Sequence, residues 1–306
     1  EPVSFTLARS DPQAFARAFG SSFERYGFAV VSDHGLPQPL IEGCLDSFRR
    51  FFALPDEVKR RYHVQGGGGA RGYTPFGVET AKGATEVDLK EFWHVGRELP
   101  PGHRYGPFMP PNVWVDEIEG FRDRVLALFG AFDAMGRDLL AAIAAHLGLD
   151  ARWFDEPTGE GNSVLRVIHY PPLPPGARGQ RAGAHEDINV ITLLLGADEA
   201  GLQVLDRDGQ WLDVNPPPGS LVCNVGDMLQ RLTNHVLPST THRVVNPPPE
   251  RAHRPRYSMP FFLHFNPDFE IRTLPGCAGP ARPDRYPESI TADEYLQQRL
   301  REIKLL

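Results

Sequence analysis

Hydrophobic residues recur at helical spacing through much of the first half of the chain. From Pro12 to Tyr26 they fall every three or four positions, and the same spacing returns from Ile41 to Phe52. A short β-like run at residues 28–31 separates these segments, and Pro55, a favoured first residue of helices, opens a third short one. The pattern predicts a helical N-terminal region in which each helix buries one hydrophobic face.

The longest helical pattern lies between about Asp116 and His146. Its hydrophobic residues hold one stripe through about eight turns, and Gly148 then supplies a stop. The methionine and the phenylalanines in this stripe fit a hydrophobic core better than a cofactor site. The segment is therefore predicted to be a scaffold helix.

From Leu165 onward the pattern changes to short hydrophobic or alternating runs separated by turn clusters. This rhythm is typical of antiparallel sandwiches and barrels, so we expect one closed or two-layered sheet over about residues 165–270. The tail, Thr291 to Glu302, begins with a Thr-x-x-Glu capping pattern and is predicted to be a terminal helix. The fold class is therefore mainly β with flanking helices. The expected divisions are residues 1–110, 111–160, 161–275 and 276–306.

Composition and charge narrow the function classes. The 30 glycines and 30 prolines make up about 20% of 306 residues, above the usual ~12%, which suits a turn-rich folded chain. A net charge of −7 argues against a nucleic-acid partner or a polybasic membrane patch. No apolar run reaches the ~20 residues that span a bilayer, and three dispersed cysteines favour reduced thiols. We expect a soluble, cytoplasmic protein.

The stretch AGAHEDINVITLLL carries the first chemical signal. His185 and Asp187 stand two positions apart at the head of an apolar run, and on an extended strand such residues point to the same side. On a helix the two side chains would point about 200° apart, so they can bind one ion together only if this segment is a strand. His242 follows several strands later. Two imidazoles and one carboxylate on one face of an octahedron form the ligand set of non-haem Fe(II) oxygenases.

A second pair strengthens this interpretation. Arg256 and Ser258 lie two apart on the strand after His242, so both face one way. A guanidinium beside a hydroxyl binds a carboxylate through charge-assisted hydrogen bonds. Without the metal set, a surface arginine–serine pair on an edge strand would be the simpler explanation. With it, an organic dianion that chelates iron through one end would need a fixed cation such as Arg256 at the other.

Together these motifs resemble a known family. HED at residues 185–187, HRV from His242 and RYS from Arg256 to Ser258 are similar to the iron(II)- and 2-oxoglutarate-dependent oxygenases, specifically the isopenicillin N synthase-like branch. The phrase YGFAVVSDHGL, Tyr26 to Leu36, resembles the N-terminal domain of that branch. Residues 223–245 resemble its metal-domain signature. The resemblance covers nearly the whole chain and implies a double-stranded β-helix (jelly roll) core.

The resemblance implies a cofactor, a co-substrate and residues for each. His185, Asp187 and His242 would bind Fe(II). Arg256 and Ser258 would bind the distal carboxylate of 2-oxoglutarate (2OG). The implied reaction oxidises, in the simplest case hydroxylates, a small organic molecule with dioxygen and releases succinate and CO2.

Tyr170 in the HYPP stretch would add a hydroxyl to that carboxylate contact. The chain departs from the family here, because Ile168 stands where an asparagine is usual. This departure removes a polar contact near the co-substrate and leaves the metal set untouched.

Four residues are candidates for the substrate side. Tyr73 follows a glycine run in a region that often comes near the iron in the family, and Asn189 shares the facing of Asp187. His94 and His264 are further candidates. For each of them an ordinary structural role is the alternative.

Several other functions stay open from the sequence. A metal-dependent hydrolase or isomerase on a cupin-like barrel would use the same ligands, although it has no particular need for Arg256 and Ser258. A binding module with a vestigial metal site is disfavoured by the intact ligand set. Within the family, an oxidase that dispenses with 2OG and an ethylene-forming enzyme are alternatives. We expect a monomer or weak dimer that takes a small-molecule substrate and dioxygen.

Overall fold

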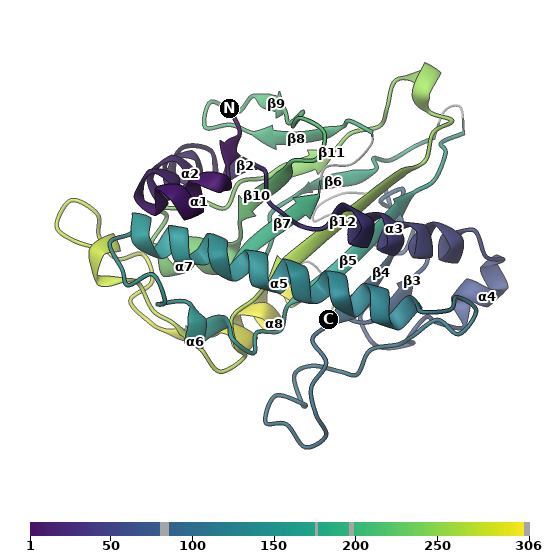
Figure 1. Cartoon of the computed structure of the whole chain (residues 1–306), viewed down its shortest axis with the longest axis horizontal. Coiled ribbons are helices and arrows are strands. Elements are labelled where there is room, and N and C mark those ends of the chain that lie inside the picture. Colours follow the sequence, from purple (N-terminus) through teal and green to yellow (C-terminus); the bar gives the residue numbers. More distant parts are fainter. Residues whose placement is uncertain (80–85, 175–176, 196–198, 303–306) are drawn as a thin grey trace.

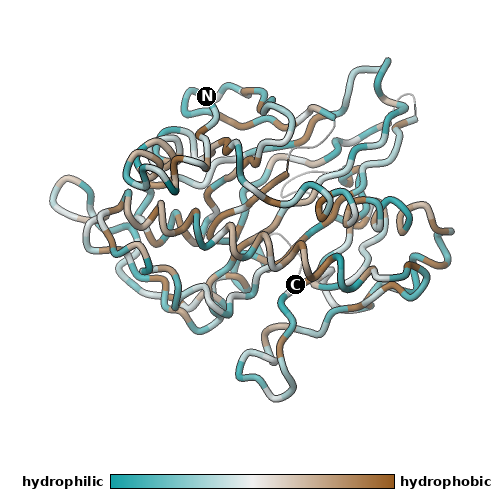
Figure 2. The backbone as a smooth tube through the Cα atoms, in the orientation of Figure 1, coloured by the Kyte–Doolittle hydropathy of each residue, from teal (hydrophilic) through white to brown (hydrophobic). Residues whose placement is uncertain are grey.

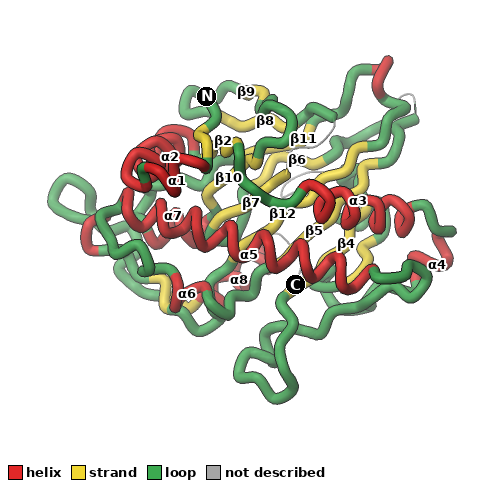
Figure 3. Tube along the Cα trace, in the orientation of Figure 1, coloured by secondary structure: helices red, strands yellow, loops and turns green. Residues whose placement is uncertain are grey.

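Two β-sheets face each other in the structure, and helices cover the outer face of the larger one (Figure 1). The computed structural model describes residues 1–79, 86–174, 177–195 and 199–302. Figure 3 shows the long helix α5 (Phe121–His146) lying across the strands of the larger sheet. This two-layered arrangement is the one predicted from the turn-separated strands.

The larger sheet has eight strands in the order β1-β2-β10-β7-β12-β5-β4-β3. All neighbours pair antiparallel except β1 and β2, which are parallel. The strands are β1 Val3–Ser4, β2 Phe28–Ser32, β3 Gly72–Thr74, β4 Glu91–Gly96, β5 Val164–Tyr170, β7 Ile191–Leu195, β10 Leu221–Val225 and β12 Arg256–Leu263. Strands from the first hundred residues thus extend the sheet at both edges.

The helical interpretation of the first half missed β3 and β4. Every residue of β4 is buried, so its sequence shows no alternation of polar and hydrophobic positions. Tertiary pairing with β5, from Glu91 opposite His169 to Gly96 opposite Val164, sets this strand instead. The expected divisions at about residues 110, 160 and 275 stay a prediction.

The smaller sheet has four strands in the order β6-β11-β8-β9. In it His185, the last residue of β6, lies directly opposite His242, the first residue of β11. Two further short strands, β13 and β14, pair with each other. The bounds are β6 Ala182–His185, β8 Leu202–Leu205, β9 Trp211–Asp213, β11 His242–Val244, β13 Glu270–Ile271 and β14 Ile290–Thr291.

The helices mostly match the predicted segments. The terminal helix α8 begins after Thr291, whose hydroxyl and backbone N–H bond the carboxylate of Glu294 while Glu294 N–H bonds the hydroxyl, as the capping pattern predicted. Pro55 precedes α4 with an extended backbone. The bounds are α1 Thr6–Ser10, α2 Pro12–Tyr26, α3 Gln38–Phe52, α4 Asp56–Arg60, α6 Asp155–Thr158, α7 Asp227–Leu232 and α8 Ala292–Glu302, with 3-10 turns at Pro249–Arg251 and Pro275–Cys277.

Helix α5 anchors the central strand β12. It starts at Phe121, later than the predicted Asp116, because Gly120 before it adopts a left-handed backbone with φ of 66°. Its hydrophobic stripe, visible in Figure 2 as brown positions along the helix, packs Phe132 on Phe261 with ring centroids 5.5 Å apart. A Cβ on Gly136 would lie 2.4 Å from Leu263, so helix and strand touch closely. The helix therefore fixes the strand that carries Arg256 and Ser258.

Two further observations concern the whole of the described chain. None of its helices is long and apolar enough to cross a membrane. Cys44, Cys223 and Cys277 are buried and unpaired, as the odd cysteine count predicted.

Candidate metal and co-substrate site

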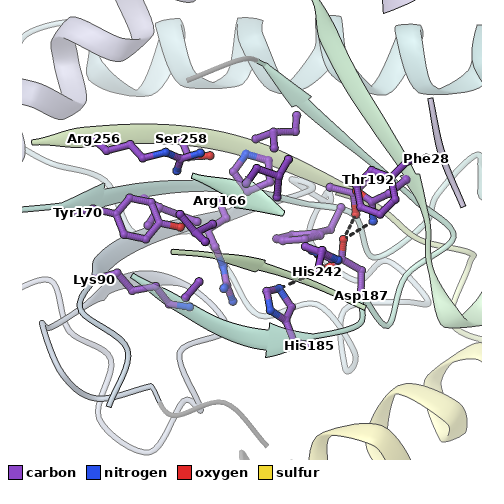
Figure 4. Close-up of a pocket in the computed structure, with 18 residues that line it drawn as sticks. Phe28, Lys90, Arg166, Tyr170, His185, Asp187, Thr192, His242, Arg256 and Ser258 are labelled. Atoms are coloured by element: carbon purple, nitrogen blue, oxygen red, sulfur yellow. Dashed lines mark hydrogen bonds and ion pairs between the residues drawn. The ribbon is translucent and has the colours of Figure 1, made fainter. Parts of the chain in front are cut away.

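A cavity lies between the two sheets (Figure 4). Its walls come from the inward faces of β5, β7, β10 and β12 on one side and of β6, β8 and β11 on the other. The space between these side chains, including open solvent at the mouth, is about 560 Å³. Residues far apart in sequence therefore meet around one hollow.

The three predicted metal ligands converge at this cavity. Asp187 Oδ1 lies 3.8 Å from His185 Nε2 and 3.7 Å from His242 Nε2. One ligand atom from each residue falls within 4.8 Å of the others, and no other such group occurs among the described residues. The pairing of β6 with β11 produces this proximity, because it places the two imidazoles on opposite strands in register.

Hydrogen bonds orient all three ligands. The Nδ1–H groups of His185 and His242 donate to the carbonyls of Gly183 and Thr240, at 2.7 and 3.1 Å, which leaves each Nε2 lone pair free. Asp187 Oδ2 accepts from Thr192 Oγ1 at 2.5 Å and from Asn224 Nδ2 at 2.7 Å.

These contacts leave Asp187 Oδ1 turned toward the two imidazoles. Two neutral imidazole nitrogens and one carboxylate oxygen form a donor set that fits Fe(II).

Burial and neighbouring groups shift the pKa values of His185 and Asp187. Burial lowers the pKa of His185 to about 4, and the neighbouring His242 lowers it further in the same direction. Burial alone would raise the pKa of Asp187, but the two imidazoles and the bonds from Thr192 and Asn224 bring that pKa below its usual value. A neutral imidazole and an ionised carboxylate are the metal-binding forms of these groups.

The predicted co-substrate residues line the same cavity at its other end. Arg256 lies opposite Tyr170, and Ser258 lies opposite Ile168, across the β12–β5 ladder. The guanidinium carbon of Arg256 lies 5.1 Å from the centroid of the Tyr170 ring. Arg256 is 3% exposed, its Nε donates to the Glu199 carbonyl, and its Nη1 has no hydrogen-bond partner. A buried guanidinium with an unused donor is suited to an anionic ligand.

The pKa of Arg256 is lowered by burial, and Tyr170 partly offsets this effect. Ile168, the residue at the usual asparagine position, also lines the cavity. Its side chain faces inward beside Ser258 and offers no hydrogen bond. Ile168 therefore cannot make the polar contact that the family resemblance implies for an asparagine at this position.

Tyr73 and Asn189, two of the four substrate candidates, have structural partners instead of a place in the cavity wall. The Tyr73 hydroxyl donates to Glu91 at 2.5 Å, within the main hydrophobic core. Burial and that bond raise the pKa of Tyr73. Asn189 bonds the Ile191 carbonyl and Thr192 Oγ1, so it supports the threonine that holds Asp187.

The two histidine candidates do not line the cavity either. His94 Nδ1–H donates to the Gly69 carbonyl, and its Nε2 accepts from Nε of Arg166 at 2.5 Å. His264 borders a second, smaller cavity beside α8. Burial lowers the pKa of both, in His264 to about 4.

The sequence interpretation missed two cations that line the cavity, Lys90 and Arg166. Each of them points to the same side of the sheet as Tyr170, a predicted site residue. Arg166 lies four positions before Tyr170 on the same strand, and the register of β4 with β5 continues to place Lys90 opposite Tyr170. Alternate side chains of β5 point to the same side, and this alternation could have identified Arg166 from the sequence. Lys90 could not be identified in this way, because strand β4 was not predicted.

Comparison with known proteins agrees with this geometry. Residues 3–117 match the family described as non-haem dioxygenase in morphine synthesis N-terminal, and residues 161–265 match the 2OG-Fe(II) oxygenase superfamily. The chain is 35% identical over 287 residues to a 2-oxoglutarate-Fe(II) type oxidoreductase of Emericella nidulans, covering 90% of this chain and 81% of that protein. The chain belongs to the 2OG-Fe(II) oxygenase superfamily.

Solved structures of other 2OG-Fe(II) oxygenases superpose on nearly the whole chain. A Caulobacter crescentus protein assigned to the family is 62% identical, with a TM-score of 0.93 over 99% of this chain and 98% of that one. A full-length Neurospora crassa protein in complex with alpha-KG is 32% identical, with a TM-score of 0.86 over 98% and 94%. The expected double-stranded β-helix core is thereby confirmed.

This 2OG-Fe(II) oxygenase is a non-haem dioxygenase that uses Fe(II) and 2OG to oxidise a small molecule. The predicted function, cofactor and co-substrate are confirmed at this level. Hydrolysis or isomerisation on a cupin-like barrel has no support from these relatives.

Proposed function

We propose that His185, Asp187 and His242 hold the iron and that Arg256, Ser258 and Tyr170 hold the distal carboxylate of 2OG. One observation carries the proposal: three ligand atoms within 4.8 Å of one another face the same cavity as a buried arginine with an unused donor. Tyr170 stacks against that arginine. Ser258 supplies a hydroxyl on the same strand face.

Bound iron would activate dioxygen, which is the oxidant: two of its four oxidising equivalents convert 2OG to succinate and CO2, and the other two convert a C–H bond to an alcohol. The chain holds and orients the reactants. Thr192 and Asn224 fix the metal-facing oxygen of Asp187, and the Gly183 and Thr240 carbonyls fix the imidazole tautomers. Arg256 keeps its charge when buried, so the dianion is anchored at one end while its other end reaches the metal. Hydrophobic strands on both sides limit water near the reacting centre.

Hydroxylation is the simplest outcome, and we propose it over ring closure or ethylene formation. The net charge of −7 and the absence of a strong basic field support a small-molecule substrate rather than a nucleic acid. Three buried thiols without disulfides support a reducing compartment, and we propose a cytoplasmic monomer or weak dimer.

Anaerobic spectroscopy tests the metal and co-substrate assignment. Adding Fe(II) and then 2OG to the metal-free protein should produce a weak visible metal-to-ligand absorption. His242→Gln should abolish the band, whereas His253→Gln, at an exposed histidine, should leave it unchanged. A well-folded protein without the band, or a band that survives His242→Gln, contradicts the assignment. Product analysis for succinate and for ethylene then separates the related reaction types.

A further inference from the structure

Helix α8 carries an arginine that reaches the metal-ligand segments from outside the cavity. Arg299 lies in the last turn of this helix, and its Nη2 lies 3.0 Å from Asp227 Oδ2 and 4.0 Å from Glu186 Oε2. Glu186 stands between the proposed iron ligands His185 and Asp187 in the sequence. Figure 4 shows helix α8, in pale yellow, beyond the end of the cavity where these ligands lie. One side chain of α8 therefore contacts two segments next to the iron site.

The first of these contacts leads to Asp187 through Asp227. Asp227 is 3% exposed, and Arg299 is its only ion-pair partner among the described residues. Asp227 is also the first residue of helix α7, and its backbone N–H donates to the Asp187 carbonyl at 2.7 Å. A buried carboxylate needs a counter-charge to stay in place. Arg299 therefore holds the residue whose N–H fixes the backbone of Asp187.

The second contact leads to His242 through Glu186. The Oε1 atom of Glu186 accepts a hydrogen bond from Thr241 Oγ1 at 2.9 Å. Because Thr241 directly precedes His242, this bond links the two segments that carry the proposed ligands. The other carboxylate oxygen of Glu186 forms the weaker ion pair with Arg299, at 4.0 Å. The same cation thus supports both ligand segments.

Helix α8 has other anchors that do not lead to the ligands. The backbone N–H of Ala292 donates to the Phe269 carbonyl at 2.9 Å. From helix α7, the guanidinium carbon of Arg231 lies 5.6 Å from the centroid of the Tyr295 ring. These contacts hold α8 against the protein without Arg299. Docking of the helix alone therefore does not account for the position of the Arg299 side chain.

Building on the proposed function, we propose that Arg299 is a positioning residue for the iron site. It acts through Asp227 and Glu186 and contacts neither the metal nor the substrate. Groups that orient metal ligands from outside contribute about 10–100-fold to metal affinity. Arg299 is one contact further from the metal than such groups, so its removal should cost affinity at the lower end of this range.

Co(II) binding to the folded, metal-free protein tests this inference. The visible absorption of bound Co(II) reports both its affinity and its ligand geometry. Arg299→Met should raise the dissociation constant about tenfold and alter the absorption of the bound ion. Arg299→Lys keeps the charge and should restore most of the affinity. Asp227→Asn should also weaken binding, and the double variant should bind no more weakly than the worse single variant, because the two residues act as a pair.

Arg231→Met is the matched control, because it removes an arginine that packs against α8 but forms no ion pair among the described residues. This variant should lower the free energy of unfolding and leave the Co(II) affinity unchanged. If it weakens Co(II) binding as much as Arg299→Met does, or if Arg299→Met binds like the wild type, Arg299 only docks the helix and the inference is wrong. Additive losses in the double variant would also contradict it. The proposed function fails separately, if His242→Gln binds Co(II) as tightly as the wild type.

Discussion

Two parts of the cavity lining hold positive charge in different ways. In the first part, the co-substrate end, Arg256 on β12 has a backbone carbonyl and an aromatic ring as neighbours and no ion pair among the described residues. In the second part, on or beside the neighbouring strands β5 and β4 of the same sheet, Lys90 is held by two carboxylates, and Arg166 shares one of them. The first part is incomplete until an anion arrives. In the second part, the two carboxylates match the two cations.

This difference predicts which charged residues contribute to ligand binding and which contribute to the stability of the fold. A charge that waits for a ligand costs the protein free energy in the absence of that ligand, and its removal should affect binding rather than folding. A charge already paired inside the protein contributes to the folded state, and its removal exposes a partner. The two parts of the lining therefore should respond in opposite ways to the same kind of substitution.

Lys90→Met should have the largest effect on the folded state. It leaves Glu79 and Asp88 without the ammonium that lies 2.6 and 2.8 Å away, so the free energy of unfolding should fall by about 3–5 kcal/mol. Urea unfolding of the metal-free protein measures this, and the affinity for 2OG should change less than about tenfold. An unchanged unfolding curve with weakened 2OG binding would move Lys90 to the co-substrate end.

Arg256→Leu should show the reverse behaviour. We expect the concentration of 2OG required for half-saturation to rise by a factor that corresponds to about 2–5 kcal/mol, because one half of a buried charge pair is lost. The free energy of unfolding without 2OG should stay the same or increase, since an unpaired buried cation disappears. Titration of the visible absorption with 2OG measures the first effect. Unaltered co-substrate affinity would show that Arg256 has another role.

Thr192→Val tests how the metal ligands are held. The variant removes the 2.5 Å hydrogen bond to Asp187 Oδ2 and should lower Fe(II) affinity by about 10–100-fold. Thr158→Val is a matched control, because Thr158 is also buried but bonds the distant Phe154 carbonyl. Equal metal affinities in both variants would mean that the hydroxyl does not orient the carboxylate.

His264 directly follows strand β12 and does not line this cavity. Its pKa is lowered from 6.5 to about 4 by burial, so the unfolded chain takes up a proton first as the pH falls. The free energy of unfolding should therefore fall between about pH 6.5 and 4 and show no such contribution above that window. His264→Gln should flatten this slope in urea titrations at several pH values. A slope identical to wild type would contradict the shift.

The sequence was sufficient to predict site residues whose spacing along a strand already places their side chains on the same face. His185 and Asp187 share a strand face, and Arg256 and Ser258 share another, so period two alone predicted both pairs. The long helix and the sheet-forming second half followed from hydrophobic periodicity and turn clusters. The function class depended on combining these pairs with the family resemblance.

The sequence was insufficient to predict site residues whose surroundings depend on contacts between distant segments of the chain. Strand β4 is buried on both faces and gave no alternation, so Lys90 and its register with Tyr170 stayed hidden. Asn189 shares the facing of Asp187, yet its side chain turns to Thr192 and Ile191. Thr192 and Asn224 support Asp187 from two separate strands, and only the assembled sheet brings them together.

The position of His242 opposite His185 in the β6–β11 ladder has an evolutionary consequence. Inserting or deleting a single residue within either strand would turn one imidazole to the far side, because successive side chains alternate. The connections between the strands escape this constraint. Lineages of this enzyme can therefore lengthen or rewrite their loops to admit new substrates, while the two short strands stay fixed in length.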